Sequence, residues 1–152
     1  MKIRKAKIED AKLLSNIAFE SKSFWGYPQE WLDMWKDGLT IKSAYILANE
    51  LYCLTENEEV LGWFALEFIQ DSRNGDLGHF WLRPSKIGKG LGKVLMEKAI
   101  SLAKEFGFEE LVVVSDPNAQ RFYEKFGFEL FDKLESQPKG RFLPVLKRKI
   151  KI

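Results

Sequence analysis

Three glycines, Gly88, Gly90 and Gly92, alternate with other residues between an apolar run and an amphipathic run. Glycine lets the backbone turn sharply and approach a ligand closely, because it carries no Cβ. The amphipathic run predicts a helix, and a helix N-terminus presents unpaired N–H groups and a partial positive charge. Together these features predict a seat for phosphate, with Lys89 adding a positive charge at its rim. A plain glycine-rich turn between strand and helix fits the spacing equally well.

Two well-known phosphate loops fit this stretch badly. A Walker A loop ends in Gly-Lys-Ser/Thr, whereas Gly92 and Lys93 are followed here by Val94. A dinucleotide fingerprint has the form G-x-G-x-x-G, whereas this chain has G-x-G-x-G. The spacing of the glycines therefore makes a dinucleotide-binding domain the weaker alternative. It stays open because Asp116 lies about 20 residues further on, where a ribose-binding acid would stand.

A second motif follows the apolar run 111–114. Asp116 before Pro117 is typical of a helix start, and Gly127 is placed to end that helix. Apolar residues recur between them at helical spacing: Ala119, Phe122, Tyr123 and Phe126. The stretch therefore predicts a short amphipathic helix that reads "RFYEKFGF" at its end.

The two motifs, in this order and in a chain of this length, resemble the GNAT superfamily of acetyl-CoA-dependent N-acetyltransferases. The resemblance covers residues 61–131 well and extends weakly into residues 136–144. Ile87 departs from it, because the loop of the family usually begins with Gln or Arg. Since backbone N–H groups grip the pyrophosphate in this family, we expect cofactor binding to survive that change.

The resemblance implies an enzyme that moves an acetyl group from acetyl-CoA to a primary amine by direct transfer in a ternary complex. Tyr123 matches the tyrosine that protonates the departing thiolate, and a packing role is its alternative. Cys53 lies far in sequence from both motifs, which disfavours an acetyl-enzyme. A non-catalytic module that senses acyl-CoA is the alternative function. The expected cofactor-binding residues are Phe80, Trp81, Leu82, Ile87, Gly88, Lys89, Gly90, Leu91, Gly92 and Asn118.

The general base is less clear from the sequence. Gly78 stands near the position at which members of the family often carry Glu. His79 is its neighbour and has a suitable pKa range, so His79 is the catalytic candidate, with a structural histidine as the alternative. Glu67 and Asp76 are further candidates whose sequence context resembles that of surface charges.

The acceptor pocket is expected to lie at the N-terminal helices and the late hairpin. Trp25 and Tyr27, beside a glycine, are predicted to wall a pocket that holds an amine. Glu30 is predicted to attract that amine, and Arg141 to bind a carboxylate of the acceptor. Two further aromatic residues of this region, Trp31 and Trp35, lie one helical turn apart and are expected to pack on the sheet.

The composition restricts the class of protein. With 152 residues and 45% hydrophobic residues, the chain suits a single acetyltransferase-like domain, residues 1–152. A net charge of +2 gives no reason to expect nucleic acid as a partner, and no apolar run is long enough for a membrane. The single cysteine and single histidine favour a reducing cytoplasm and no metal site. We expect a monomer or a homodimer.

The periodicities predict an α/β protein with a mixed sheet and helices on both faces. The unit at 77–82, 91–106 and 111–114 predicts two parallel strands joined by a helix, and the run 111–114 a strand covered on both faces. Helices are also predicted at 8–22, 28–36 and 42–48, and strands at 2–6, 52–55, 59–68, 128–133 and 142–150.

Overall fold

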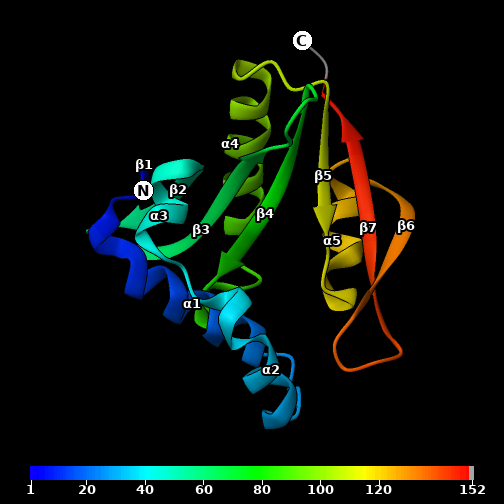
Figure 1. Cartoon of the computed structure of the whole chain (residues 1–152). Helices are drawn as coiled ribbons and strands as arrows, with labels where there is room; N and C mark the ends of the chain where they lie inside the picture. Colours follow the sequence, from blue (N-terminus) through cyan, green and yellow to red (C-terminus); the bar gives the residue numbers. More distant parts are fainter. Residues whose placement is uncertain (151–152) are drawn as a thin grey trace. The chain divides into compact units, whose positions relative to one another are not determined.

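The computed structural model describes residues 1–150 (Figure 1). Its α-helices are α1 (Ala11–Ser23), α2 (Gln29–Leu39), α3 (Ser43–Ala48), α4 (Leu91–Glu105) and α5 (Gln120–Lys125). Short 3₁₀ helices are η1 (Ile8–Asp10), η2 (Pro84–Lys86) and η3 (Pro117–Ala119). The strands are β1 (Lys2–Lys5), β2 (Glu50–Glu56), β3 (Glu59–Phe68), β4 (Asn74–Leu82), β5 (Glu110–Val114), β6 (Glu129–Ser136) and β7 (Arg141–Lys149).

The seven strands form one mixed sheet in the order β1-β2-β3-β4-β5-β7-β6. β4 and β5 run parallel, as the strand–helix–strand pattern predicts, whereas β7 pairs antiparallel with both β5 and β6. By its contacts the chain divides into two compact units. Unit 1 comprises residues 1–65 and 79–95, and unit 2 comprises residues 66–78 and those from 96 onward.

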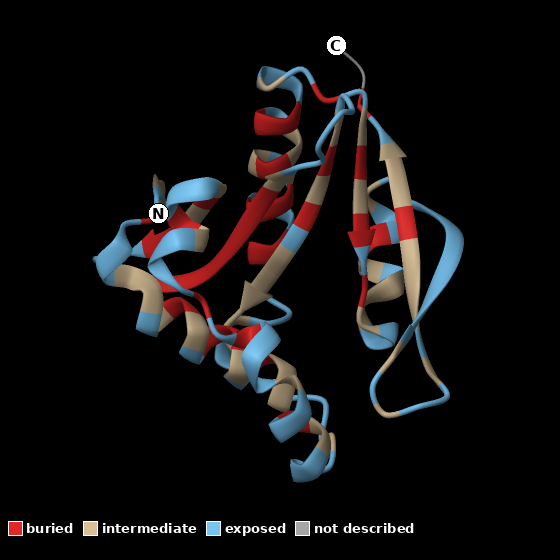
Figure 2. Ribbon diagram, viewed as in Figure 1, coloured by how far each residue is buried: buried red, intermediate tan, exposed pale blue. Residues whose placement is uncertain are grey.

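In unit 1 the core lies between α1 and the sheet. Leu14, Ile17 and Ala18 follow one another at helical spacing and are completely buried. They belong to one apolar cluster with Trp63 and Ala65 of β3. The Trp63 indole N–H donates a hydrogen bond of 3.1 Å to the Leu14 carbonyl oxygen. This bond satisfies the one polar atom of a buried aromatic side chain, and it fixes α1 on β3. Most of β3 is buried (Figure 2).

In unit 2 the two faces of β5 are buried to different degrees. Leu111 and Val113 are buried, as is Tyr123 of α5, whose ring lies 5.7 Å from that of Phe128. Val114, in contrast, is 38% exposed. The prediction that this apolar strand is covered on both faces therefore fails at Val114, the last residue of the strand.

Several boundaries differ from the predictions for local reasons. Residues 8–10 form a 3₁₀ turn, held by the Asp10 carboxylate, which accepts from the Lys7 backbone N–H and from Arg4. β4 begins at Asn74, three residues earlier than predicted. In the β2–β3 turn, Asn57 and Glu58 have φ of 51° and 69°, which is typical of a tight hairpin.

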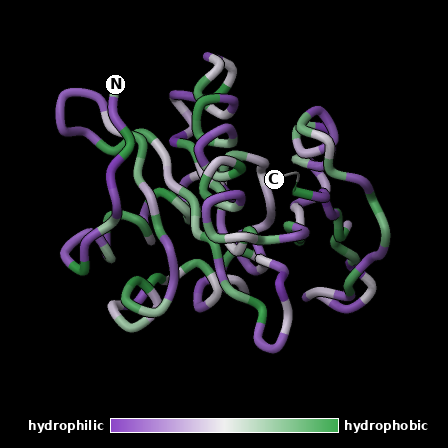
Figure 3. The backbone as a smooth tube through the Cα atoms, turned by 90° about the horizontal axis from the view of Figure 1, so that it is seen from above, coloured by the Kyte–Doolittle hydropathy of each residue, from purple (hydrophilic) through white to green (hydrophobic). Residues whose placement is uncertain are grey.

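The last strand is not at the edge of the sheet, because β7 lies between β5 and β6. The basic run 147–149 is thus part of an interior strand of the sheet. Along the helices, hydrophilic and hydrophobic stretches alternate (Figure 3), in keeping with one buried and one exposed side.

Candidate active site

The end of β4 approaches β3 unusually closely. A Cβ added at Gly62 of β3 would lie 2.6 Å from the Trp81 carbonyl oxygen and 2.6 Å from Cδ2 of Leu82. Only glycine therefore allows the two strands this spacing at the segment 80–82, which the sequence assigns to cofactor binding. Gly62 was not identified from the sequence, because nothing local in β3 shows which strand approaches it.

Arg83 follows the last residue of β4 and bonds the chain to β3 at this point. Its backbone N–H donates to the Leu61 carbonyl at 2.9 Å, and its Nε donates to the Val60 carbonyl at 2.7 Å. The guanidinium also lies 3.7 Å from a carboxylate oxygen of Glu20 on α1. These contacts fix the point at which the glycine-rich loop begins.

The loop itself has the geometry that a phosphate seat needs. Gly88 and Gly90 have φ of 83° and 79°, in the left-handed region, and a Cβ added at either would meet nothing within 4 Å. Within residues 1–150, the backbone N–H groups of Gly88, Lys89 and Gly90 donate to no hydrogen-bond acceptor. Residues 83–93 contain four cations and no carboxylate: Arg83, Lys86, Lys89 and Lys93. Open N–H donors before a helix of 15 residues, in a positive field, fit a pyrophosphate.

His79 is packed among aromatic rings of unit 1. The Trp81 indole N–H donates to His79 Nδ1 at 2.9 Å, and the rings of Trp63 and Tyr45 lie 5.0 Å and 5.7 Å from the imidazole. Burial lowers the pKa of His79 to about 4. A neutral imidazole whose Nδ1 accepts carries its proton on Nε2. The side chain can therefore donate from Nε2 but has no vacant nitrogen with which to take a proton.

The pKa of Asp76, in unit 2, is shifted in the opposite direction, upward. Asp76 lies on β4 opposite Val112 of β5, and it is half-buried. Burial, assisted by the charge of Glu67, raises the pKa of Asp76 to about 6. A carboxyl with this pKa is largely ionised at pH 7 and still basic enough to take up a proton. Its sequence context suggested a surface charge, because burial by neighbouring strands is not visible locally.

In unit 2, two of the predicted site residues, Asn118 and Arg141, contact the carboxylate of Asp116, and its charge acts on a third, Tyr123. Oδ1 of Asp116 accepts hydrogen bonds from the backbone N–H of Asn118 at 2.8 Å and from its side-chain amide at 2.9 Å. Oδ2 of Asp116 lies 3.7 Å from the Arg141 guanidinium. Burial, and then the charge of Asp116, raises the pKa of Tyr123 above its usual range.

The amino-acid sequence matches the profile of a known family, described as Acetyltransferase (GNAT) family, over residues 13–128. The match covers more than half of the 152 residues and includes the glycine loop and α5. The chain belongs to the acetyltransferase (GNAT) family. The expected family, fold class and enzyme class are thereby confirmed, and with them acetyl-CoA as the co-substrate.

Solved structures of other acetyltransferases have the same fold as this chain. The PaiA N-acetyltransferase from Thermoplasma acidophilum, in complex with coenzyme A, is 22% identical with a TM-score of 0.81, over 97% of this chain and 98% of that one. A GNAT family acetyltransferase from Elizabethkingia anophelis, with acetyl-CoA bound, is 17% identical with a TM-score of 0.71, over 97% of each chain.

The ribosomal-protein-S18-alanine N-acetyltransferase from Escherichia coli is also similar, at 16% identity and a TM-score of 0.73, over 99% of this chain and 94% of that one. At these identities the likeness concerns the fold alone. A comparison of the amino-acid sequence with curated proteins finds no significant match.

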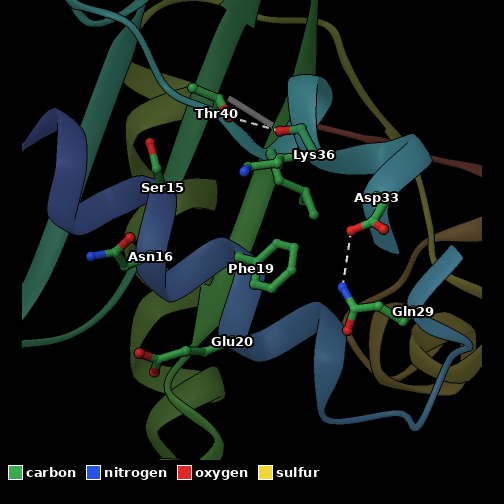
Figure 4. Close-up of a pocket in the computed structure, with 9 residues that line it drawn as sticks. Ser15, Asn16, Phe19, Glu20, Gln29, Asp33, Lys36 and Thr40 are labelled. Carbon is green, nitrogen blue, oxygen red and sulfur yellow. Dashed lines mark hydrogen bonds between the residues drawn. The ribbon is translucent and has the colours of Figure 1, made fainter. Parts of the chain in front are cut away.

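The acetyltransferase has a cavity of about 480 Å³ in unit 1, between α1 and α2 (Figure 4). The Phe19 ring and Leu39 supply apolar surface, whereas carboxylates and hydroxyls stand around them. Trp25, Tyr27 and Glu30 do not line this cavity. The lining residues are Ser15, Asn16, Phe19, Glu20, Gln29, Asp33, Lys36, Leu39 and Thr40.

The predicted aromatic wall of the acetyltransferase divides into two parts. Trp25 is 42% exposed and packs edge-to-face on the neighbouring Phe24, at 5.2 Å between ring centroids. Tyr27 instead packs against Trp35, 4.9 Å away, and the Lys22 ammonium lies over both rings at 5.3 Å and 4.7 Å. The cluster around Tyr27 therefore already holds a cation of the chain itself.

The other predicted residues are distributed over the two units. Glu30 is exposed in the first turn of α2, and Ile87 is 38% exposed at the start of the loop. Arg141 and Asn118 both contact Asp116, and their roles toward substrates stay predictions. In residues 1–150, no helix is long and apolar enough to cross a membrane, and no cluster of three or more metal-ligating side chains exists.

Proposed function

We propose that this acetyltransferase moves the acetyl group of acetyl-CoA to the nitrogen of a primary amine, in a ternary complex and within a single catalytic domain. The glycine loop carries this proposal. Its two left-handed glycines turn the backbone, and within residues 1–150 the N–H groups of residues 88–90 donate to no acceptor. A loop of this kind binds the pyrophosphate of the co-substrate through its backbone, so Ile87 needs no polar side chain.

The transfer needs a donor for the oxyanion and an acid for the thiolate. The backbone of Phe80, Trp81 and Leu82 bonds the pantetheine arm, and an oriented N–H of this strand polarises the thioester carbonyl. The amine nitrogen forms the new bond to the acetyl carbon as the carbon–sulfur bond breaks. The Tyr123 hydroxyl then gives its proton to the thiolate, and it regains one from solvent.

The ammonium form of the acceptor must lose a proton before it attacks. Asp76 and His79 are the candidates for the base, and the observations favour Asp76. The pKa of Asp76 is raised to about 6, whereas that of His79 is lowered to about 4 and its Nδ1 already accepts from Trp81. A part for His79 as the base stays a prediction.

The acceptor is a small-molecule amine or an amine of a protein. Trp25 and Glu30 at the α1–α2 turn are proposed to contact it, since Trp25 presents an exposed ring and Glu30 an exposed carboxylate. An aromatic ring and a carboxylate each attract an ammonium group. We further propose that the protein acts in the cytoplasm.

The test is a measurement of CoA release from acetyl-CoA against a panel of polyamines, amino acids and peptide N-termini. Amine-dependent release with acetylated product, detected by mass spectrometry, supports the proposal. Tight binding of acetyl-CoA by calorimetry, without turnover on any amine, would favour the sensing module. Affinity for NAD(H) in place of acetyl-CoA would favour the dinucleotide-binding domain.

A further inference from the structure

The Asp116 side chain lies at the junction of two segments of unit 2 that are far apart in the sequence. It caps η3, which leads directly into α5, and it faces Arg141 at the beginning of β7. Only 9% of the Asp116 side chain and 11% of the Arg141 side chain are exposed. An ion pair this well shielded from water is strongly coupled, because the surrounding dielectric is low.

Arg141 reaches Asp116 from a hairpin whose end is held by its own backbone. The Arg141 N–H donates to the Pro138 carbonyl at 3.1 Å, and Ser136 pairs with Arg141 at the end of the β6–β7 ladder. On the other side, the Ser115 N–H donates to the Pro144 carbonyl at 2.9 Å. The residue before Asp116 is thus bonded to the same strand that carries Arg141.

Tyr123 lies on α5, the helix that follows the 3₁₀ helix η3 capped by Asp116. Its side chain is only 6% exposed, and the rings of Phe122 and Phe128 lie 5.4 Å and 5.7 Å from it. The negative charge of Asp116 opposes ionisation of this phenol, in addition to the larger effect of burial. Both effects keep the hydroxyl protonated, which is the state required of an acid.

We propose that Asp116 is a positioning residue of the acetyl-transfer site, which orients α5 and Tyr123 and uses Arg141 as its counter-ion. Arg141 on this assignment neutralises Asp116 and joins the β6–β7 hairpin to the start of α5, rather than binding a carboxylate of the acceptor. The Asn118 side-chain amide likewise donates its hydrogen bond to Asp116. The proposal rests on the proposed function, because it assumes that Tyr123 acts as the acid.

The experiment compares Asp116→Asn with Glu124→Gln, which removes an exposed carboxylate from α5 itself. Asparagine keeps an oxygen for the Asn118 N–H groups and removes only the charge. We expect kcat to fall about tenfold, on the scale of one charge-assisted hydrogen bond, while KM for acetyl-CoA stays near that of the parent. The alkaline limb of the pH profile of kcat should move to lower pH, because Tyr123 then ionises more easily.

A direct probe separates this proposal from the proposed function. The protein has four tyrosines, so ¹³Cζ labelling of tyrosine gives four resonances, and Tyr123→Phe assigns one of them. In Asp116→Asn that resonance should titrate at lower pH than in the parent, whatever the activity. If Tyr123→Phe is fully active but this shift occurs, the role of Tyr123 fails and the influence of Asp116 on it stands.

Arg141→Gln and the double variant keep the test decisive if Asp116→Asn folds poorly. Arg141→Gln leaves the Asp116 charge buried without its counter-ion, so it should lower Tm more than the double variant does. Additive changes in Tm would show that the two residues do not act as a pair. The proposal is overturned if Asp116→Asn matches Glu124→Gln in kcat, in pH profile and in the Tyr123 titration.

Discussion

The glycine loop of unit 1 and the Asp116 cluster of unit 2 are built in contrasting ways. The loop offers backbone N–H groups, and Gly88 and Gly90 are exposed, with open space beside both. The cluster is made of side chains, in which Asp116, only 9% exposed, contacts residues both 2 and 25 positions away in the chain. A site made of backbone depends on local conformation, whereas a site made of side chains depends on which segments meet.

The largest effect is expected where the loop is broken. Gly90→Asp places a carboxylate against the pyrophosphate and requires a side chain at φ of 79°. Affinity for acetyl-CoA measured by calorimetry should fall by at least about 100-fold, or ~2.7 kcal/mol. Gly107→Asp is the matched control, because Gly107 has φ of 74° just beyond the other end of α4 and also has open space beside it. Equal affinities for the two variants would show that the phosphate lies elsewhere.

The next largest effect is expected in unit 2, at the buried side chain of Tyr123. Tyr123→Phe keeps the ring among its aromatic neighbours and removes only the hydroxyl. We expect kcat to fall about 100-fold, the scale of general acid catalysis, with little change in Tm. Tyr52→Phe is the control, since it removes a hydroxyl that bonds Glu50 at 3.2 Å on β2. An unchanged kcat with a good acceptor would make Tyr123 a packing residue.

A third prediction contrasts the half-buried carboxyl of Asp76, whose pKa is raised, with Asp116, which is paired with Arg141. Since the pKa of Asp76 is raised from 3.8 to about 6, the folded protein retains a proton that the unfolded chain releases in this range. Its contribution to the free energy of unfolding is complete below about pH 4 and is lost as the pH rises through 6. Asp76→Asn should therefore be more stable than the parent at pH 8.

The same substitution should also lower kcat/KM and remove an acid limb near pH 6, if Asp76 is the base. Thermal unfolding at pH 4 and pH 8 and a pH–rate profile provide the two measurements. Asp37→Asn, at an exposed position of α2, serves as the control. If Asp76→Asn keeps full activity and also gains the expected stability, a group other than Asp76 is the base.

The smallest effect concerns the exposed aromatic residue of unit 1. Trp25→Ala should raise KM for the amine about fivefold and leave kcat and KM for acetyl-CoA nearly unchanged, because it removes uniform binding. Met34→Ala, at another exposed apolar residue near the turn, should leave both KM values unaltered. A rise in both KM values for Trp25→Ala would contradict a pocket that is specific to the acceptor.

The sequence predicted most of the secondary structure, because each element depends on neighbours within a few residues. The helix after the glycine loop shows its apolar period, and Gly107 ends it with φ of 74°. The boundaries that failed have longer-range causes. Asn74 joins β4 through its pairing with Glu110, 36 positions further along the chain, which no local pattern shows.

The acetyltransferase motifs, the glycine loop and the tyrosine of α5 could be recognised in the sequence by itself. Their chemistry lies in the conformational freedom of glycine and in the period of a short helix, and both are written locally. The tertiary structure decided that β7 enters between β5 and β6, that Arg141 meets Asp116, and that Asp76 is half-buried. Charge pairing and burial depend on strand order and on packing between distant segments, so a carboxylate acquires its pKa and its partner only when the sheet has formed.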